Sequence, residues 1–135
     1  MRIRLLGFLF LIFQLAGCTK LPYNNLDNEQ LEAMLRQGIP IIDVRRPEEW
    51  QQTGVIAGSI RLTFVDHNGQ LLPDFLPRLT EIAPKNDPVI LICRTGNRTD
   101  VLARHLVEYM GYTKVYNVKD GITRWISAGK PVNRL

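Results

Sequence analysis

The segment VILICRTGNRTD, residues 89–100, places a single cysteine between a strand-like apolar run and a charged turn. The run ends at Cys93, and arginine, threonine, glycine, asparagine and a second arginine follow directly. Free cysteine thiols ionise with a pKa of about 8.5, and the thiolate is the reactive nucleophile. The residue types around Cys93 therefore decide whether this thiol reacts or is buried and inert.

Three features of the turn favour a thiolate at Cys93. Arg94 and Arg98 supply positive charge close in the sequence. A helix beginning near Asn97 would direct its partly positive N-terminus at the sulfur. Gly96 can turn successive backbone N–H groups inward and so form a site for an anion. A purely structural core cysteine is the alternative, but it predicts apolar residues after Cys93 as well as before it.

The N-terminal residues predict an export signal and a lipid anchor. Residues 1–17 contain a basic start, an apolar run too short for a typical membrane span, and small residues before Cys18. The sequence LAGC, residues 15–18, resembles the lipobox of bacterial lipoproteins, whose cysteine becomes lipidated after cleavage. We therefore expect residues 1–17 to be a signal peptide and residues 18–26 to be a lipid-anchored tether. A plain N-terminal anchor helix is the alternative.

The lipobox resemblance also predicts a location. Thr19 is not the aspartate that retains many such lipoproteins at the inner membrane, so we expect a periplasm-facing protein anchored to the outer membrane. Cys93 would then be the one cysteine without lipid, and an internal disulfide is excluded.

Composition predicts one globular domain, residues 27–135, in a chain of 135 residues with 45% hydrophobic and 22% charged residues. The net charge of +4 falls to about +2 without Arg2 and Arg4, since 17 − 2 = 15 basic residues face 13 acidic ones. This small excess of positive charge gives no reason to expect a nucleic-acid partner. We also expect the protein to be a monomer. His67 and His105 with one thiol do not make a metal site.

Hydrophobic periodicity predicts strands that alternate with helices. The expected strands are 39–44, 58–62, 88–93 and 114–118, and the expected helices are 26–38, 46–54, 71–83, 97–111 and 120–129. This order indicates an α/β fold whose mainly parallel central sheet is covered by helices on both faces. In the expected helix 97–111, six residues recur at the spacing of a helix: Val101, Leu102, His105, Leu106, Tyr109 and Met110. Ligands of such sheets bind at the carboxyl ends of the strands, where Cys93 is expected.

Four motifs in order give the chain a family resemblance. The loop CRTGNR, residues 93–98, resembles the active-site loop of the rhodanese family, the thiosulfate sulfurtransferases. Three further segments resemble other signatures of that family: DVRRPEEW (43–50), GVIAGSI (54–60) and GITRWISAGKPV (121–132). The resemblance implies a rhodanese-like α/β fold.

The resemblance implies a role for each motif residue. Cys93 would be the catalytic nucleophile, and the next five residues would bind the substrate anion and a persulfide: Arg94, Thr95, Gly96, Asn97 and Arg98. Asp43 and Arg45 would support this loop and the neighbouring helix, although a surface ion pair of Arg45 with Glu49 is an equal alternative. No metal or organic cofactor is implied.

The implied activity is transfer of a sulfane sulfur from thiosulfate, or from a persulfide, through a Cys93 persulfide. The acceptor would be cyanide or a thiol, which a protein can also carry. The C-x4-R spacing disfavours the related phosphatases and arsenate reductases, which use C-x5-R. A non-catalytic module that binds a partner or carries a persulfide is the second interpretation.

Three positions depart from the family pattern. Val55 replaces a histidine, Asp120 replaces a glycine, and Asp100 places a carboxylate in the first turn after the loop. Asp100 can favour the helix N-terminus, but its charge can also oppose a thiolate. We expect these residues to affect rate and substrate preference rather than the identity of the site.

Overall fold

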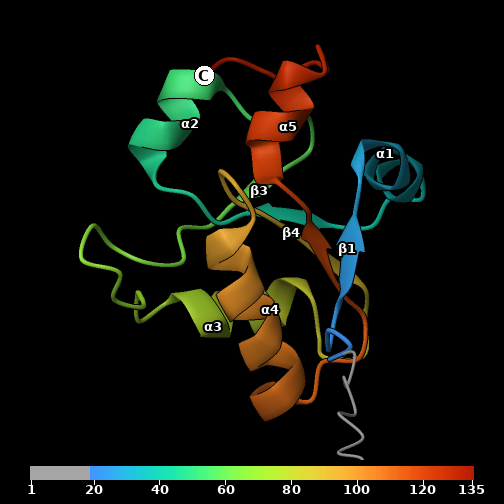
Figure 1. The fold of residues 1–135 in the computed structure, drawn as a ribbon. Helices are drawn as coiled ribbons and strands as arrows, with labels where there is room; N and C mark the ends of the chain where they lie inside the picture. The colour runs from blue at the N-terminus through green and yellow to red at the C-terminus, as the bar shows by residue number, and fades with distance from the viewer. Residues whose placement is uncertain (1–18) are drawn as a thin grey trace, which may run out of the picture.

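The computed structural model describes residues 19–135, and within them five strands form one parallel sheet (Figure 1). The strand order is β1-β5-β4-β2-β3. The strands are β1 (Asn24–Leu26), β2 (Ile41–Asp43), β3 (Ile60–Arg61), β4 (Val89–Ile92) and β5 (Val115–Val118). The helices are α1 (Asn28–Arg36), α2 (Pro47–Thr53), α3 (Phe75–Ile82), α4 (Asn97–Met110) and α5 (Gly121–Ser127). The predicted α/β fold with a parallel central sheet and helices on both faces is confirmed.

Helices cover both faces of the sheet because its central strand β4 is apolar on both sides. Val89 and Leu91 pack with α3 and α4, whereas Ile90 and Ile92 pack with α1 and α5. All four residues of β4 are fully buried, as expected of a parallel strand between two layers. Cys93 continues this alternation toward the α4 layer, so the fold itself aims its side chain at the N-terminal turn of that helix.

Local signals explain where the helices begin and end. Asp27 caps α1 in a capping box with Gln30, and Pro47 occupies the first turn of α2. Gly111 ends α4 in the left-handed conformation. Val55 is buried and exchanges backbone hydrogen bonds of 2.9 and 2.7 Å with Asn133, so this departure from the family pattern sits at a structural position.

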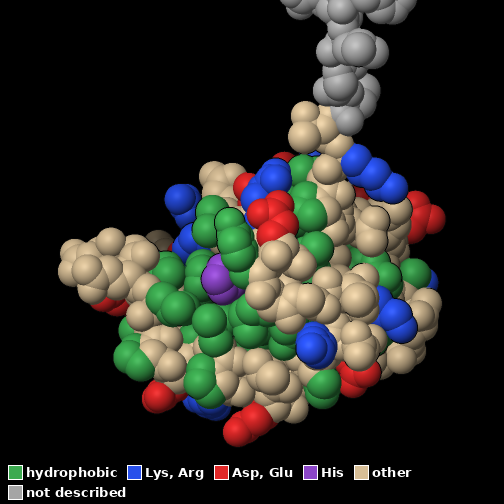
Figure 2. Space-filling view, turned by 90° about the horizontal axis from the view of Figure 1, so that it is seen from below, with side chains coloured by type: hydrophobic (Ala, Val, Ile, Leu, Met, Phe, Trp, Pro, Cys, Tyr) green, Lys and Arg blue, Asp and Glu red, His purple; other side chains and the backbone are tan. Residues whose placement is uncertain are grey.

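One expectation was wrong. Residues 18–26 are not all tether, because Asn24–Leu26 form strand β1 beside β5, with Tyr23 and Leu26 buried. The six residues with helical spacing all lie in α4 as expected, but three of them are exposed: Val101 (61%), Tyr109 (78%) and His105. The sheet instead receives Leu102, Ala103 and Leu106, which form a narrower stripe of α4. Figure 2 shows hydrophobic side chains gathered on the face of the molecule seen from below.

No helix among residues 19–135 is long and apolar enough to cross a membrane. Cys18 and residues 1–17 lie outside the described residues, so the expected signal peptide and lipidation stay predictions.

Candidate active site

Cys93 lies at the carboxyl end of the central strand, with its side chain 1% exposed. The Gly96 backbone N–H donates to the sulfur over 3.2 Å, and the Thr99 hydroxyl lies 3.3 Å from it. Gly96 has φ +92°, a left-handed conformation that points its N–H back toward Cys93. The sulfur therefore sits under the N-terminus of α4, where backbone N–H groups and the helix dipole favour negative charge.

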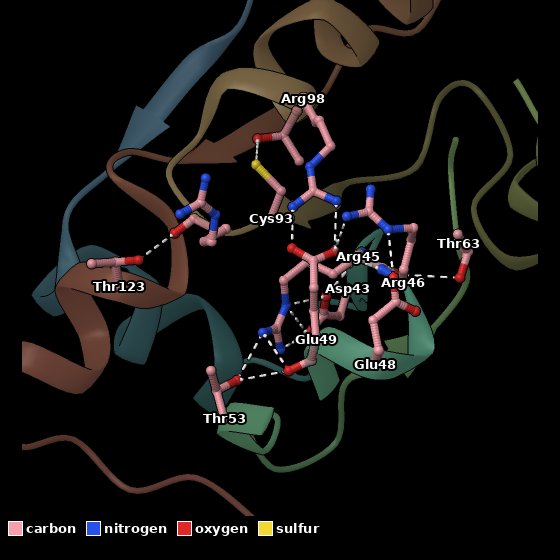
Figure 3. Close-up of polar contacts among 12 residues, drawn as sticks. Asp43, Arg45, Arg46, Glu48, Glu49, Thr53, Thr63, Cys93, Arg98 and Thr123 are labelled. Atoms are coloured by element: carbon pink, nitrogen blue, oxygen red, sulfur yellow. Dashed lines mark hydrogen bonds and ion pairs between the residues drawn. The ribbon is translucent and has the colours of Figure 1, made fainter. Parts of the chain in front are cut away.

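The start of α5 holds the loop from its other side. Ile122 N–H donates to the Cys93 carbonyl over 2.9 Å, and Thr123 N–H donates to the Arg94 carbonyl over 3.1 Å. The Thr123 hydroxyl donates to the same Arg94 carbonyl over 2.9 Å (Figure 3). These bonds fix the carbonyl oxygens of Cys93 and Arg94 toward α5, while the Gly96 N–H faces the sulfur. The site depends on contact between two loops more than 20 residues apart in sequence.

Gly121 permits this contact. An added Cβ would lie 2.5 Å from both the Cys93 carbonyl oxygen and the Arg94 carbonyl carbon, and Gly121 has φ +61°. We expect Gly121→Ala to lower the free energy of unfolding by about 2–4 kcal/mol, because left-handed strain and a backbone clash add up. Urea denaturation measures this change. Gly129→Ala is the matched control: Gly129 has φ +74° with nothing within 4 Å of the added Cβ, so only the strain of about 1–2 kcal/mol applies. Equal losses of unfolding free energy in the two variants would contradict the close approach of Gly121 to the Cys93 and Arg94 carbonyls.

Asp120 takes the left-handed conformation, with φ +63°, directly before Gly121. Aspartate is among the few residues besides glycine that adopt this region readily. Aspartate can therefore adopt the backbone conformation found at this position, where the family pattern has glycine.

Arg98 is bound by α2 rather than directed at the sulfur. Its guanidinium donates two hydrogen bonds to the Glu49 carboxylate, of 2.8 and 2.6 Å (Figure 3). Burial alone would raise the pKa of Glu49, but hydrogen bonds from Arg98 and from the Arg46 backbone N–H outweigh it and lower the pKa to about 2. Arg94 is exposed and forms no ion pair with any described residue, so its charge is available to an anion.

The lowered pKa of Glu49 predicts acid sensitivity. The Glu49 contribution to stability is complete above its ordinary pKa of 4.5 and is lost as the pH falls through about 2. We expect the wild type to lose stability over this interval more steeply than Glu49→Gln, as measured by urea denaturation across that pH range. Glu81→Gln is the control, because Glu81 is exposed and has no ion pair among residues 19–135. Parallel curves for wild type and Glu49→Gln would contradict the effect.

Asp43 and Arg45 form a buried ion pair with side chains 0% and 1% exposed. Arg45 donates to both carboxylate oxygens of Asp43, over 2.8 to 3.2 Å. It also bonds the Thr53 hydroxyl and the carbonyls of Glu49 and Gly54 in and after α2. The alternative of a surface pair between Arg45 and the Glu49 side chain is therefore wrong. The pair fixes α2, and α2 carries the Glu49 that binds Arg98, so its link to the loop after Cys93 is indirect.

Sequence reasoning missed Thr99 and Asn117. Thr99 is fully buried, and its hydroxyl lies 2.5 Å from Asn117 Oδ1 on β5 as well as 3.3 Å from the Cys93 sulfur. Asn117 Oδ1 only accepts, so the threonine donates to it and can accept from the thiol; rotation of the hydroxyl would let it donate to a thiolate instead. The sequence does contain a signal for Asn117, because it is the one amide side chain in the expected strand 114–118.

The charge of Asp100 is compensated locally. Arg104 Nε donates to its carboxylate over 3.0 Å, and the Tyr23 hydroxyl donates to the same oxygen. Burial and the hydrogen bond to Asp100 raise the pKa of Tyr23 to about 12, so the phenol keeps its proton and continues to donate. These partners reduce the opposition of Asp100 to a thiolate at Cys93.

The histidines lie apart from Cys93 in the structure. His67 contacts the exposed Glu48 at 3.2 Å, and His105 stacks against Tyr109 with ring centroids 5.5 Å apart. Among residues 19–135, no group of three or more histidine, cysteine, aspartate or glutamate side chains could hold a metal ion.

Comparison with known proteins gives a consistent result. Residues 27–128 match the rhodanese-like domain family. The chain is 32% identical over 111 residues to a sulfurtransferase of Allochromatium vinosum, covering 81% of this chain and 94% of that protein. It is 30% identical over 103 residues to the thiosulfate sulfurtransferase GlpE of Stutzerimonas stutzeri, covering 76% and 84%. The crystal structure of Rv0390 from M. tuberculosis superposes with a TM-score of 0.68 at 27% identity, covering 84% of this chain and 99% of that one. With its fold, its loop and its sulfurtransferase relatives in agreement, this chain belongs to the rhodanese-like domain family.

Proposed function

We propose that the chain is a thiosulfate sulfurtransferase that carries sulfur as a persulfide on Cys93. The observation that carries this proposal is the position of the Cys93 sulfur, 3.2 Å from the Gly96 N–H and under the N-terminus of α4. This position favours a negatively charged sulfur both before and after it accepts a second sulfur atom. The name of the Stutzerimonas relative supports thiosulfate as the donor.

The first half-reaction forms the persulfide. The Cys93 thiolate attacks the outer sulfur of thiosulfate, and the bond from that sulfur to the sulfonate sulfur breaks. Sulfite leaves with the electron pair of that bond, and Cys93 keeps the transferred sulfur as a persulfide anion. Arg94 offers its charge to the sulfonate oxygens, while the Gly96 N–H and the N-terminus of α4 stabilise the sulfur that forms the persulfide.

The second half-reaction removes the transferred sulfur from Cys93. A nucleophile, either cyanide or a thiolate, attacks the outer sulfur of the persulfide. The sulfur–sulfur bond breaks, Cys93 leaves as a thiolate, and thiocyanate or a new persulfide departs. The Gly96 N–H stabilises the departing thiolate just as it stabilised the attacking one.

The test is to incubate the full-length chain with thiosulfate and cyanide and to measure thiocyanate. We expect turnover, and mass spectrometry after thiosulfate alone should show a gain of one sulfur atom. Sulfur gain without turnover would favour the persulfide-carrying module. The absence of both sulfur gain and turnover would refute the proposal. Phosphate release from an aryl phosphate would instead favour the phosphatase interpretation.

We also propose that Cys18 is lipidated and anchors the protein to the outer membrane, facing the periplasm. The described chain starts at Thr19, near the amino ends of the strands, whereas Cys93 lies at their carboxyl ends (Figure 1). An anchor there would turn the catalytic loop away from the lipid surface. Labelled fatty acid should be incorporated into the wild type and not into Cys18→Ala, and equal labelling of the two would refute the anchor.

A further inference from the structure

A pocket of about 320 Å³ opens between the end of β3 and the start of α3, and it has no role in the reaction described above. Its floor is apolar, formed by the buried side chains of Trp50, Leu62 and Phe75. Two exposed arginines, Arg61 and Arg78, line it as well. The remaining lining residues are Thr63, Leu72, Pro73 and Asp74. An apolar floor with charged groups at its border is typical of a site for a small organic ion.

The charge of this pocket is positive, because two arginines face one carboxylate in its lining. Neither Arg61 nor Arg78 forms an ion pair with a carboxylate in residues 19–135, and Asp74 is the one acidic side chain of the lining. The Arg61 guanidinium lies over the Trp50 ring, 5.7 Å from its centroid, which orders the arginine. Trp50 is 8% exposed, and its indole N–H has no partner among the described residues. These groups favour an anion.

The position of the pocket relates it to Cys93. Leu62 and Thr63 follow β3, Cys93 follows β4, and β2 lies between these two strands. Since neighbouring strands are about 4.8 Å apart, the pocket starts about 10 Å from the catalytic cysteine along the same edge of the sheet. The Thr63 hydroxyl donates to the Arg45 carbonyl over 2.9 Å and so ties this side of the pocket to the end of β2. An extended chain of three residues spans about 10 Å.

We propose that this pocket binds the carboxylate of the sulfur acceptor, a short peptide-like thiol with its carboxylate about 10 Å from its sulfur. This inference rests on the proposed function. The carboxylate binds Arg61 and Arg78, the body of the acceptor covers Trp50, and the thiolate reaches the persulfide. That thiolate attacks the outer sulfur, the bond to the Cys93 sulfur breaks, Cys93 keeps the electron pair, and the acceptor leaves as a persulfide.

The kinetic test compares two acceptors of equal length and equal thiol. The full-length chain and thiosulfate are assayed with N-acetyl-Cys-Gly-Gly carrying either a free C-terminal carboxylate or a C-terminal amide. We expect the carboxylate form to have a KM about 5–10-fold lower in the wild type, as for a partly exposed charge-assisted contact. The ratio of the two KM values should fall to about one in Arg61→Gln/Arg78→Gln. Arg36→Gln, which alters an exposed arginine of α1, should keep the wild-type ratio. Equal KM values in the wild type would overturn the proposal.

A binding test separates this inference from the catalytic proposal. The same peptides with an S-methylated cysteine cannot accept sulfur, so they probe binding alone. The carboxylate peptide should shift the Trp50 indole N–H signal in a ¹⁵N NMR spectrum, and the amide peptide should not. A shift in a chain without turnover would support the pocket while refuting the enzyme. No shift with either peptide would refute the pocket, whatever the turnover.

Discussion

Cys93→Ser is expected to lower thiocyanate formation from thiosulfate and cyanide by at least about 10³-fold. A serine oxygen can still accept the Gly96 N–H bond that the sulfur accepts over 3.2 Å, so the loop keeps its shape. A hydroxyl, however, is far from ionised near neutral pH and cannot hold a sulfane sulfur as a persulfide. Under the proposed function, the substitution removes the nucleophile and the sulfur carrier together. Rates of thiocyanate formation measure the effect.

The control for this variant is its stability. A buried hydroxyl that keeps its hydrogen bonds costs little, so the free energy of unfolding should fall by no more than about 1–2 kcal/mol. Thermal or urea denaturation checks that the variant is folded at the assay temperature. A folded serine variant that retains wild-type turnover would remove Cys93 from the reaction. A variant that still gains a sulfur atom from thiosulfate would lead to the same conclusion.

The residue pattern predicted most of the fold because its strongest elements are local. Val89–Ile92 is apolar throughout, as a strand buried on both faces must be, and α1 carries its own capping residues. Strand β1 was missed because Asn24 and Asn25 are polar and only Leu26 is fully buried. Its place in the sheet comes from pairing with β5, more than 90 residues later, which no local pattern reports.

In the candidate site too, local features could be predicted from the sequence and contacts between distant residues could not. Cys93 and its glycine-containing loop could be predicted because a strand, a turn and a helix N-terminus follow one another in sequence. The partner of Arg98 could not, because Glu49 lies 49 residues away and α2 must first be positioned by Arg45. Thr99 and Asn117 were missed for a related reason. Their hydrogen bond crosses from α4 to β5, so it exists only in the folded chain.

Arg45→Met is expected to lower the free energy of unfolding by about 3–5 kcal/mol, the typical cost of leaving a buried charge without its partner. Asp43 is fully buried, and its carboxylate accepts its side-chain bonds from Arg45. The methionine would also leave the Glu49 and Gly54 carbonyls and the Thr53 hydroxyl without this donor. Urea denaturation measures the loss. Arg46→Met is the matched control, because Arg46 is 26% exposed and pairs with the exposed Glu48, so its loss of stability should be much smaller.

A double-mutant cycle distinguishes the ion pair from simple loss of packing at this position. Asp43→Asn removes the charge that Arg45→Met would leave buried, so the double variant should lose less stability than the sum of the two single variants. Strictly additive losses would show that the charges of Asp43 and Arg45 do not interact, and a loss in Arg45→Met no larger than in Arg46→Met would show the same. Because Arg45 fixes α2 and α2 fixes Glu49, sulfur transfer by the folded fraction of Arg45→Met should also fall. Asp43 and Arg45 would then act as positioning residues, which affect the reaction through Arg98 without touching the transferred sulfur.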